Sequence, residues 1–337
     1  MAMTTARRKA PNFDRDGKHT SWLEVSVGRG KQPVRLPVTI VRKGAGPSVL
    51  FTGGNHGDEY EGPVALMKLA RDLDADDLVG GTVVIMPMLN PPAIAAGTRT
   101  SPIDGKNLNR VFPGDPKGSP TERIAHLVTS EILPHVETVY DLHAGGRASV
   151  IIPSVMIHKL RSTRLMARTV AAMKAFRAPV GIVIKEFESD GMIDTTVEKL
   201  GKVFGCCELG GAGMLTPETV GVTETGIRNL MIHLGIMKGR LRAPTWLGRK
   251  QSIVLEALSY GQYVHAEAPG IYEPFVDLAA KVDKGQVIGQ IHNPKAPGRS
   301  PAVCTAPATG IVFARHAFGL IARGQQVALI AEESRRW

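Results

Sequence analysis

The sequence lacks several features that would place a chain in a membrane or outside the cell. It has no run of about 18 apolar residues, so we expect no membrane-spanning helix. Its polar N-terminus has no apolar segment of the kind found in secretory signals. Its 3 cysteines, two of them adjacent, form neither a disulfide framework nor a CxxC zinc motif. These absences favour a protein of the reducing cytoplasm.

The sequence is also poor in aromatic residues, which make up 5% of the chain. Its net charge is +10, but the lysines and arginines are spread along the chain, with no long basic run beyond Arg7-Arg8-Lys9. A nucleic-acid-binding surface usually combines clustered basic residues with aromatic rings that stack on bases. We therefore expect no nucleic-acid partner and no membrane partner. A small anionic substrate would gain from the same positive charge.

The length of 337 residues and the change of pattern along the chain predict two domains behind a tail. Residues 1–19 are expected to form a flexible tail, and residues 20–247 the catalytic domain. Within that domain, residues 20–43 alternate in the manner of a β-hairpin or of two edge strands, and the following strands are apolar throughout and separated by helices. This predicts an α/β fold with a mixed, mostly parallel sheet flanked by helices. Residues 248–337, with short strands between Gly and Pro, predict a small all-β barrel or sandwich.

Parallel sheets of this type bind ligands outside the carboxyl ends of their strands. Polar motifs at those ends are therefore the candidates for a functional site. The expected strands of the catalytic domain after the hairpin are 48–54, 81–90, 138–143, 180–187 and 202–209, and the expected helices are 60–74, 121–133, 164–176 and 223–237.

Two of the expected strands end in histidine motifs. The stretch TGGNHGDEYEG, residues 52–62, places His56 and Glu59 three residues apart, and the strand TVYDLH ends at His143. Two histidines and a carboxylate that leave a fourth position open are a ligand set of catalytic zinc. We predict that His56, Glu59 and His143 bind one Zn²⁺, although His143 taken alone would more often be an ordinary core or surface histidine. Asp141 either orients an imidazole ring or is simply solvated.

A hydrolytic zinc site also needs a general base. Glu208, in KVFGCCELGGAG, follows a buried strand and precedes a Gly-Gly turn. Partial burial there would raise the pKa of Glu208 into a useful range, whereas an ordinary loop glutamate is the alternative. Cys206 and Cys207 are expected to pack within the strand.

A long polar loop at 97–114 offers Arg99, Asp104, Asn107, Asn109 and Arg110, and some of these groups are suited to binding an anion. An arginine guanidinium can bind a carboxylate through two hydrogen bonds, so Asn109 and Arg110 could clamp an amino-acid carboxylate. Arg99 could instead stabilise the oxyanion that develops on an attacked carbonyl. For each of these residues taken singly, a solvated loop is the alternative.

Four motifs, NHGDEYEG, NLNRVFPG, DLHAGG and CELGG, occur in this order and resemble those of the succinylglutamate desuccinylase/aspartoacylase family of zinc hydrolases, relatives of the zinc carboxypeptidases. The resemblance covers roughly residues 45–240, and a small C-terminal β domain is also the family's arrangement. The stretch between Arg99 and Asn109 is longer here than in aspartoacylase, which bears on the role of Arg99. The resemblance implies zinc ligands His56, Glu59 and His143, the general base Glu208, the carboxylate-binding pair Asn109 and Arg110, and the carbonyl-polarising Arg99.

The resemblance further implies a zinc-dependent amidohydrolase that removes the acyl group of an N-acyl amino acid. The GTRTSPIDGKNLNR loop is similar to that of the branch that deacetylates N-acetyl-diaminobutyrate. A zinc carboxypeptidase acting on short peptides is the alternative enzyme, and a binding module without catalysis is the alternative of another class. The expected partners are one Zn²⁺ per chain and a small N-acyl amino acid, and a homo-oligomer is left open.

Overall fold

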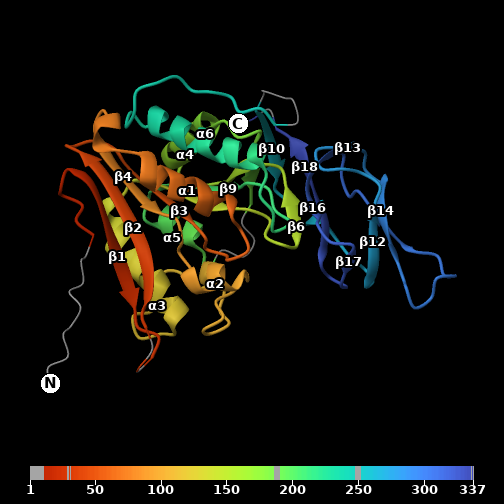
Figure 1. The fold of residues 1–337 in the computed structure, drawn as a ribbon. Helices are drawn as coiled ribbons and strands as arrows, with labels where there is room; N and C mark the ends of the chain where they lie inside the picture. The colour runs from red at the N-terminus through yellow and green to blue at the C-terminus, as the bar shows by residue number, and fades with distance from the viewer. Residues whose placement is uncertain are drawn as a thin grey trace.

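The computed structural model of the chain describes residues 11–28, 30, 32–185, 190–246, 252–334 and 336. It combines helices and strands in one part and strands alone in another (Figure 1). Most of the expected N-terminal tail, residues 1–10, and the expected domain boundary at 247–248 lie outside the described residues. The first strand begins at Gly17, two residues before the expected end of the tail at residue 19. No helix in the described ranges is long and apolar enough to cross a membrane.

A 14-stranded mixed sheet runs through the molecule. Two short strands lie beside its main path, β11 (Tyr263–His265) next to β18 and β6 (Ser149–Ile151) next to β16. In order across the sheet, the other strands are β1 (Gly17–Val25), β2 (Val34–Lys43), β4 (Gly81–Met86), β3 (Ser48–Gly53), β5 (Thr138–His143), β9 (Val203–Glu208), β7 (Ser154–His158), β8 (Val180–Ile184), β10 (Ile253–Ala257), β18 (Gln326–Glu333), β16 (Gly310–His316) and β13 (Lys281–Val282).

The directions of the strands determine which strand ends lie together at one edge of the sheet. β4, β3, β5 and β9 are parallel to one another, so the carboxyl ends of β3, β5 and β9 meet at one edge of the sheet. β1 and β2 form the expected antiparallel hairpin. β7, which the sequence pattern did not predict, runs antiparallel to β9 and parallel to β8. The predicted mixed sheet is confirmed, and from β1 to β8 across the sheet four of the seven strand pairs are parallel. The expected strand 180–187 appears as β8, and residues 186–189 lie outside the described residues.

Helices cover both faces of the sheet around β3 and β5. Successive residues of these strands point to opposite faces and therefore pack against different helices. Phe51 and Tyr140 pack in one buried cluster with α1, α4 and α6, whereas their neighbours Leu50 and Val139 pack in another with α3 and α5. α3 forms the first part of the expected helix 121–133, which continues as a π-helical turn (Val128–Ile132) and a 3₁₀ turn (Leu133–His135). The helices are α1 (Glu61–Asp72), α2 (Pro91–Ala96), α3 (Pro120–Leu127), α4 (Thr163–Phe176), α5 (Ile193–Lys199) and α6 (Pro217–His233).

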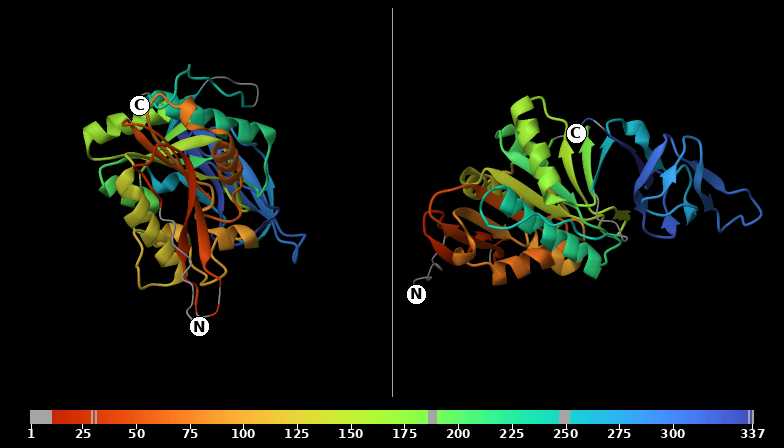
Figure 2. Two further views of the ribbon diagram at one scale, coloured as in Figure 1. Left: turned by 60° about the vertical axis from the view of Figure 1, so that its left-hand side comes forward. Right: turned by 90° about the horizontal axis from the view of Figure 1, so that it is seen from above.

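The C-terminal part of the chain consists of strands, as predicted. Figure 2 shows it, in blue, at the end of the molecule opposite the N-terminal strands. A second, antiparallel sheet lies here, and its buried side chains, such as Ile288, form one cluster with those of β18, such as Val327. In order, its strands are β15 (Ala302–Thr305), β14 (Val287–His292), β12 (Gly270–Pro274) and β17 (Leu320–Ile321).

β10 differs from its expected place in the C-terminal all-β region. It pairs in parallel with β8, and its Leu255 and Ala257 are buried in the same cluster as Ile182 and Ile184. β18 then pairs with β10, so one sheet continues from the helix-covered part into the C-terminal part. The division into domains at residue 247 stays a prediction.

Candidate metal centre and active site

The loop between β3 and α1 carries the first two candidate metal ligands. The chain leaves β3 through Gly54, whose φ of +64° favours glycine. Gly57 then packs against α2, where a Cβ atom would come within 2.0 Å of the carbonyl carbon of Ala93. These two glycines let the loop turn sharply and lie against α2. His56 and Glu59, which flank Gly57, thereby face the edge where β3, β5 and β9 end.

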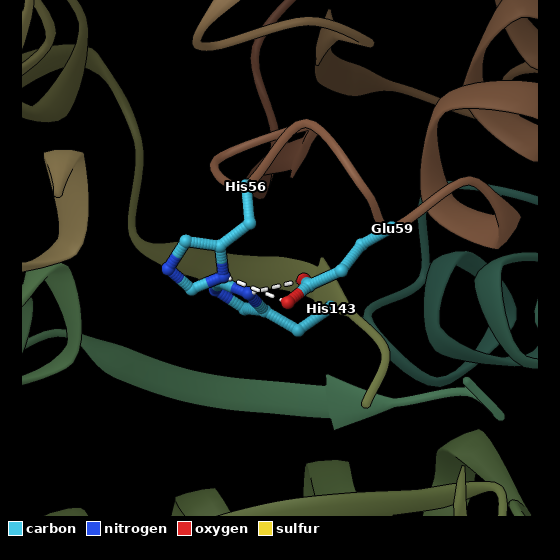
Figure 3. A group of neighbouring side chains, drawn as sticks. All are labelled: His56, Glu59 and His143. Carbon is cyan, nitrogen blue, oxygen red and sulfur yellow. Dashed lines mark hydrogen bonds and ion pairs between the residues drawn. The ribbon is translucent and has the colours of Figure 1, made fainter. Parts of the chain in front are cut away.

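The side chains of His56, Glu59 and His143 meet at this edge (Figure 3). Nδ1 of His56 lies 2.8 Å from Oε1 of Glu59, and Nδ1 of His143 lies 2.8 Å from Oε2 of the same carboxylate. One ligand atom from each residue lies within 4.8 Å of the other two, and all three side chains are buried. The sequence-predicted ligand set is therefore brought together.

Neighbouring residues fix the orientation of both imidazole rings. Nε2 of His143 donates to Oδ2 of Asp141 over 2.7 Å, and Nε2 of His56 donates to Oδ1 of Asn107 over 3.1 Å. Because Asp141 and Asn107 offer acceptors there, each ring keeps its Nε2 proton and turns Nδ1 toward Glu59. Such outer contacts are typical of metal-binding histidines. The prediction that Asp141 orients an imidazole is confirmed.

Asp141 is itself held rigidly. Its carboxylate is fully buried and accepts hydrogen bonds from Thr52 Oγ1 at 2.7 Å and from Asn55 Nδ2 at 3.1 Å. Burial disfavours its charge, but His143 and these hydrogen bonds hold the pKa of Asp141 below its usual value. The alternative of a solvated aspartate is therefore wrong.

Glu208 lies beside the histidine–carboxylate cluster. It pairs with His143 in the register of β5 and β9, so both side chains lie on the same face of neighbouring strands. Its Oε2 atom is buried and has no hydrogen-bond partner in the described part of the chain. Burial, together with the charge of Glu59, raises the pKa of Glu208 to about 8. A carboxylate with such a pKa and a free oxygen can accept and return a proton near neutral pH.

The electrostatics of Glu59 are the reverse of those of Glu208. Burial alone would raise its pKa, but the charges of His56 and His143 and their hydrogen bonds keep the pKa of Glu59 well below its ordinary value. The two glutamates at one strand edge are therefore held in different states, Glu59 as a charged carboxylate and Glu208 as a group that can carry a proton.

These groups line one cavity of about 370 Å³. The loop residues predicted to bind substrate also reach this cavity. Nη1 of Arg99 lies 3.2 Å from Oε1 of Glu59, and about half of the Arg99 side chain is exposed. Oδ1 of Asn109 accepts from the backbone N–H of Ile193 at 3.0 Å, which ties this loop to the start of α5. The polar lining comprises His56, Asp58, Glu59, Arg99, Asn109, Arg110, His143, Ser149, His158, Asp194, Cys206 and Glu208.

Other candidates take structural positions. Asp104, in the same long loop, accepts from the backbone N–H and the hydroxyl of Thr121 and so holds the start of α3. Cys207 is buried in the core on one side of β9, and Cys206 borders the cavity on the other. Neither cysteine belongs to the metal-binding group found among the described residues.

Several residues of the site were given no role from the sequence. Asn107 belongs to the NLNR motif and Asp58 to the HGDE motif, so their positions within those motifs were the available signal. His158 ends β7, and Asp194 lies in the first turn of α5, two elements that the sequence pattern did not predict. These four residues lie in loops and elements that come together through long-range strand pairing. The local sequence pattern does not indicate that they are neighbours.

The donor set fits zinc. Two neutral imidazole nitrogens and a carboxylate oxygen are ordinary ligands of Zn²⁺, and three protein ligands leave a position for water or substrate, as in catalytic sites. The acceptors Asp141 and Asn107 on the far side of each ring, and the partner-free Oε2 atom of Glu208 next to the cluster in the described part of the chain, complete this arrangement.

A family model for the succinylglutamate desuccinylase/aspartoacylase catalytic domain matches residues 45–234. A curated relative, the N-alpha-acetyl-L-2,4-diaminobutyric acid deacetylase of Halomonas elongata, is 42% identical over 324 residues, which cover 95% of this chain and 93% of that protein. The chain belongs to the succinylglutamate desuccinylase/aspartoacylase family.

Solved structures agree with this membership of the desuccinylase/aspartoacylase family. The product-bound ectoine utilization protein EutE (DoeB) from Ruegeria pomeroyi is 39% identical, with a TM-score of 0.90 over 96% of this chain and 97% of that one. A succinylglutamate desuccinylase/aspartoacylase from Rhodobacter sphaeroides is 35% identical, with a TM-score of 0.91 over 96% of this chain and 98% of that one. The predicted family and fold are thereby confirmed.

Proposed function

We propose that this family member is a zinc-dependent deacylase that hydrolyses the amide bond of an N-acyl amino acid. The observation that carries the proposal is the meeting of His56, Glu59 and His143 with the partner-free carboxylate of Glu208 in one cavity. This arrangement supplies metal ligands and a general base to the same small space.

The three ligands would hold one Zn²⁺ per chain. Bound zinc supplies Lewis-acid chemistry, which polarises a carbonyl and makes water a stronger nucleophile at neutral pH. Asp141 and Asn107 contribute by keeping the Nδ1 atoms of His143 and His56 turned toward the metal position.

Glu208 is proposed to move the proton. It accepts a proton from the attacking water, whose oxygen adds to the acyl carbon, and delivers that proton to the amide nitrogen as the C–N bond breaks. The products are a carboxylate and a free amine. The raised pKa of Glu208, about 8, suits both directions of this transfer.

The polar residues of the 97–114 loop are proposed to bind the carboxylate and the acyl oxygen of the substrate. Asn109 and Arg110 bind the free carboxylate of the amino acid, and the exposed guanidinium of Arg110 would provide the charge-assisted contacts. Arg99, adjacent to Glu59, would stabilise the oxyanion that forms on the acyl oxygen.

The substrate is proposed to be N-acetyl-diaminobutyrate. The support is the relative named for this activity, which is 42% identical over nearly the whole chain. A diaminobutyrate carries a second amine on its side chain, and a carboxylate besides the proposed metal ligand, that of Asp58, borders the cavity. The cytoplasmic location and a homo-oligomeric state stay predictions.

A substrate panel tests the proposal. The zinc-loaded enzyme would be given N-acetyl-diaminobutyrate, other N-acyl amino acids and short peptides, and the released acids and amino acids would be separated by chromatography. Release of acetate from N-acetyl-diaminobutyrate is the expected result. Cleavage of the peptides without cleavage of any N-acyl amino acid would instead support the carboxypeptidase alternative.

A further inference from the structure

Asp58 is a buried carboxylate of the cavity that the reaction outlined above does not use. It lies in the loop between His56 and Glu59, has an exposed fraction of 7%, and borders the cavity. It does not belong to the group whose ligand atoms surround the metal position.

The surroundings of Asp58 hold one of its oxygens and leave the other free. Oδ2 accepts a hydrogen bond from the backbone N–H of Arg147 over 2.9 Å. Gly146, with φ of +55°, makes this approach possible, because a Cβ atom there would come within 2.7 Å of the same oxygen. Oδ1 is buried and has no hydrogen-bond partner among the described residues.

A buried carboxylate oxygen without a partner is unfavourable, because burial removes its hydrogen bonds to water. No lysine, arginine or histidine side chain in the described ranges forms an ion pair with Asp58. A metal ion held by the neighbouring ligands would attract the charge of Asp58 but could not donate a hydrogen bond to Oδ1. A positively charged hydrogen-bond donor that enters the cavity from outside would supply both the missing hydrogen bond and an opposite charge.

An alkylammonium group meets this description, since it carries a positive charge and three N–H donors. The proposed substrate class can supply such a group from its side chain, whereas its carboxylate is assigned to Asn109 and Arg110. We propose that Asp58 binds the side-chain ammonium of an N-acyl diamino acid and so selects this substrate over N-acyl amino acids with neutral side chains. This inference rests on the proposed function, because it assigns a specificity residue to the same site.

Asp194 is the matched control in the same cavity. Its carboxylate accepts a hydrogen bond from the backbone N–H of Thr195 and lies 3.8 Å from Nε2 of His158. A basic side chain of the protein therefore already faces Asp194, which is not so for Asp58. Replacing either aspartate by asparagine removes one negative charge from the cavity at nearly constant volume.

The test compares N-acetyl-diaminobutyrate with N-acetyl-norvaline, in which a methyl group replaces the side-chain ammonium. Acetate release from both would be measured with zinc-loaded wild type, Asp58→Asn and Asp194→Asn. The wild type should prefer the diamino substrate, and Asp58→Asn should lower the ratio of the two kcat/KM values about tenfold to a hundredfold, mainly through KM. Asp194→Asn should leave the ratio close to that of the wild type.

The ratio is taken within one preparation, so a loss of metal or of folded protein affects both substrates alike and cancels. Asp58→Ser, which keeps an acceptor for the N–H of Arg147, serves if Asp58→Asn does not fold. An unchanged ratio in the Asp58 variants, or a fall in Asp194→Asn alone, would overturn the inference while leaving the deacylase intact.

A binding measurement separates this inference from the proposed function. Calorimetric titration of the zinc-loaded protein with free diaminobutyrate and with norvaline needs no turnover. Tighter binding of diaminobutyrate that is lost in Asp58→Asn supports the role of Asp58 even if neither acetylated substrate is hydrolysed. Equal binding of both amino acids by the wild type would overturn it.

Discussion

Replacing Glu208 by glutamine should separate the chemistry of the site from its metal binding. Glutamine has nearly the same shape as glutamate but cannot accept the proton of the attacking water. Because Oε2 of Glu208 has no partner in the described part of the chain, the change breaks no hydrogen bond of the side chain to the protein. It also removes a carboxyl group whose charge is disfavoured by burial. The folded state should therefore tolerate Glu208→Gln.

The expected loss in kcat follows from this position. A positioned general acid–base group contributes about 10²–10⁴-fold to the rate, which corresponds to roughly 3–5 kcal/mol of barrier at 1.36 kcal/mol per tenfold. Zinc content should stay at the wild-type level, because the metal ligands lie on other residues. The assay is steady-state acetate release, with zinc measured by mass spectrometry on the same preparation.

Glu61→Gln is the matched control for this experiment. Glu61 is also a buried glutamate near the same strand edge, and burial raises its pKa to about 7. It does not line the cavity, so the glutamine variant should turn over at close to the wild-type rate. A near-normal kcat for Glu208→Gln, or equal losses for the two variants, would refute the assignment of Glu208 as the base.

Four further predictions concern the metal, the substrate carboxylate, the substrate carbonyl and the core. His56→Ala should lose stoichiometric zinc together with activity, and a variant that keeps a full zinc equivalent in the site would show the ligand assignment to be wrong. Arg110→Ala should lower kcat/KM for an N-acyl amino acid about tenfold to a hundredfold, from a lost charge-assisted contact of roughly 1.5–3 kcal/mol, but should matter far less for the corresponding amide; equal losses would leave Arg110 a structural residue. Arg99→Ala should slow both substrates, since its proposed partner is the carbonyl that they share. Tyr140→Phe should raise the free energy of unfolding by up to about 1–3 kcal/mol, because the fully buried hydroxyl of Tyr140 has no partner in the described residues; a lower thermal midpoint would point to a hidden hydrogen bond.

The meeting of His56, Glu59 and His143 was predictable from the sequence because these residues lie at strand ends. His143 is the last residue of β5, and His56 and Glu59 follow β3 directly. Parallel neighbours must bring such positions to one edge, whatever the rest of the fold does. The same logic places Glu208 at the end of β9, opposite His143.

The parts of the structure that were missed depend on long-range pairing. β7 and β10 are short strands whose local pattern does not tell which neighbour they join or in which direction. β10 joins β8 because Leu255 fills the same buried cluster as Ile182, a contact between segments far apart in the sequence. Asp194 was missed for a similar reason. The short helix α5 packs on the sheet through Ile193 and Val197, and this long-range packing brings Asp194 to the cavity. Local periodicity carries none of this information.

The central claim is that zinc bound by His56, Glu59 and His143 is required for deacylation. The most direct test removes the metal with a chelator, adds zinc back in steps, and measures bound zinc and acetate release from N-acetyl-diaminobutyrate in the same samples. We expect activity to rise in proportion to bound zinc, to stop rising at one equivalent per chain, and to be absent from His56→Ala at every step. Full turnover by the metal-free protein, or by His56→Ala without bound zinc, would contradict the account.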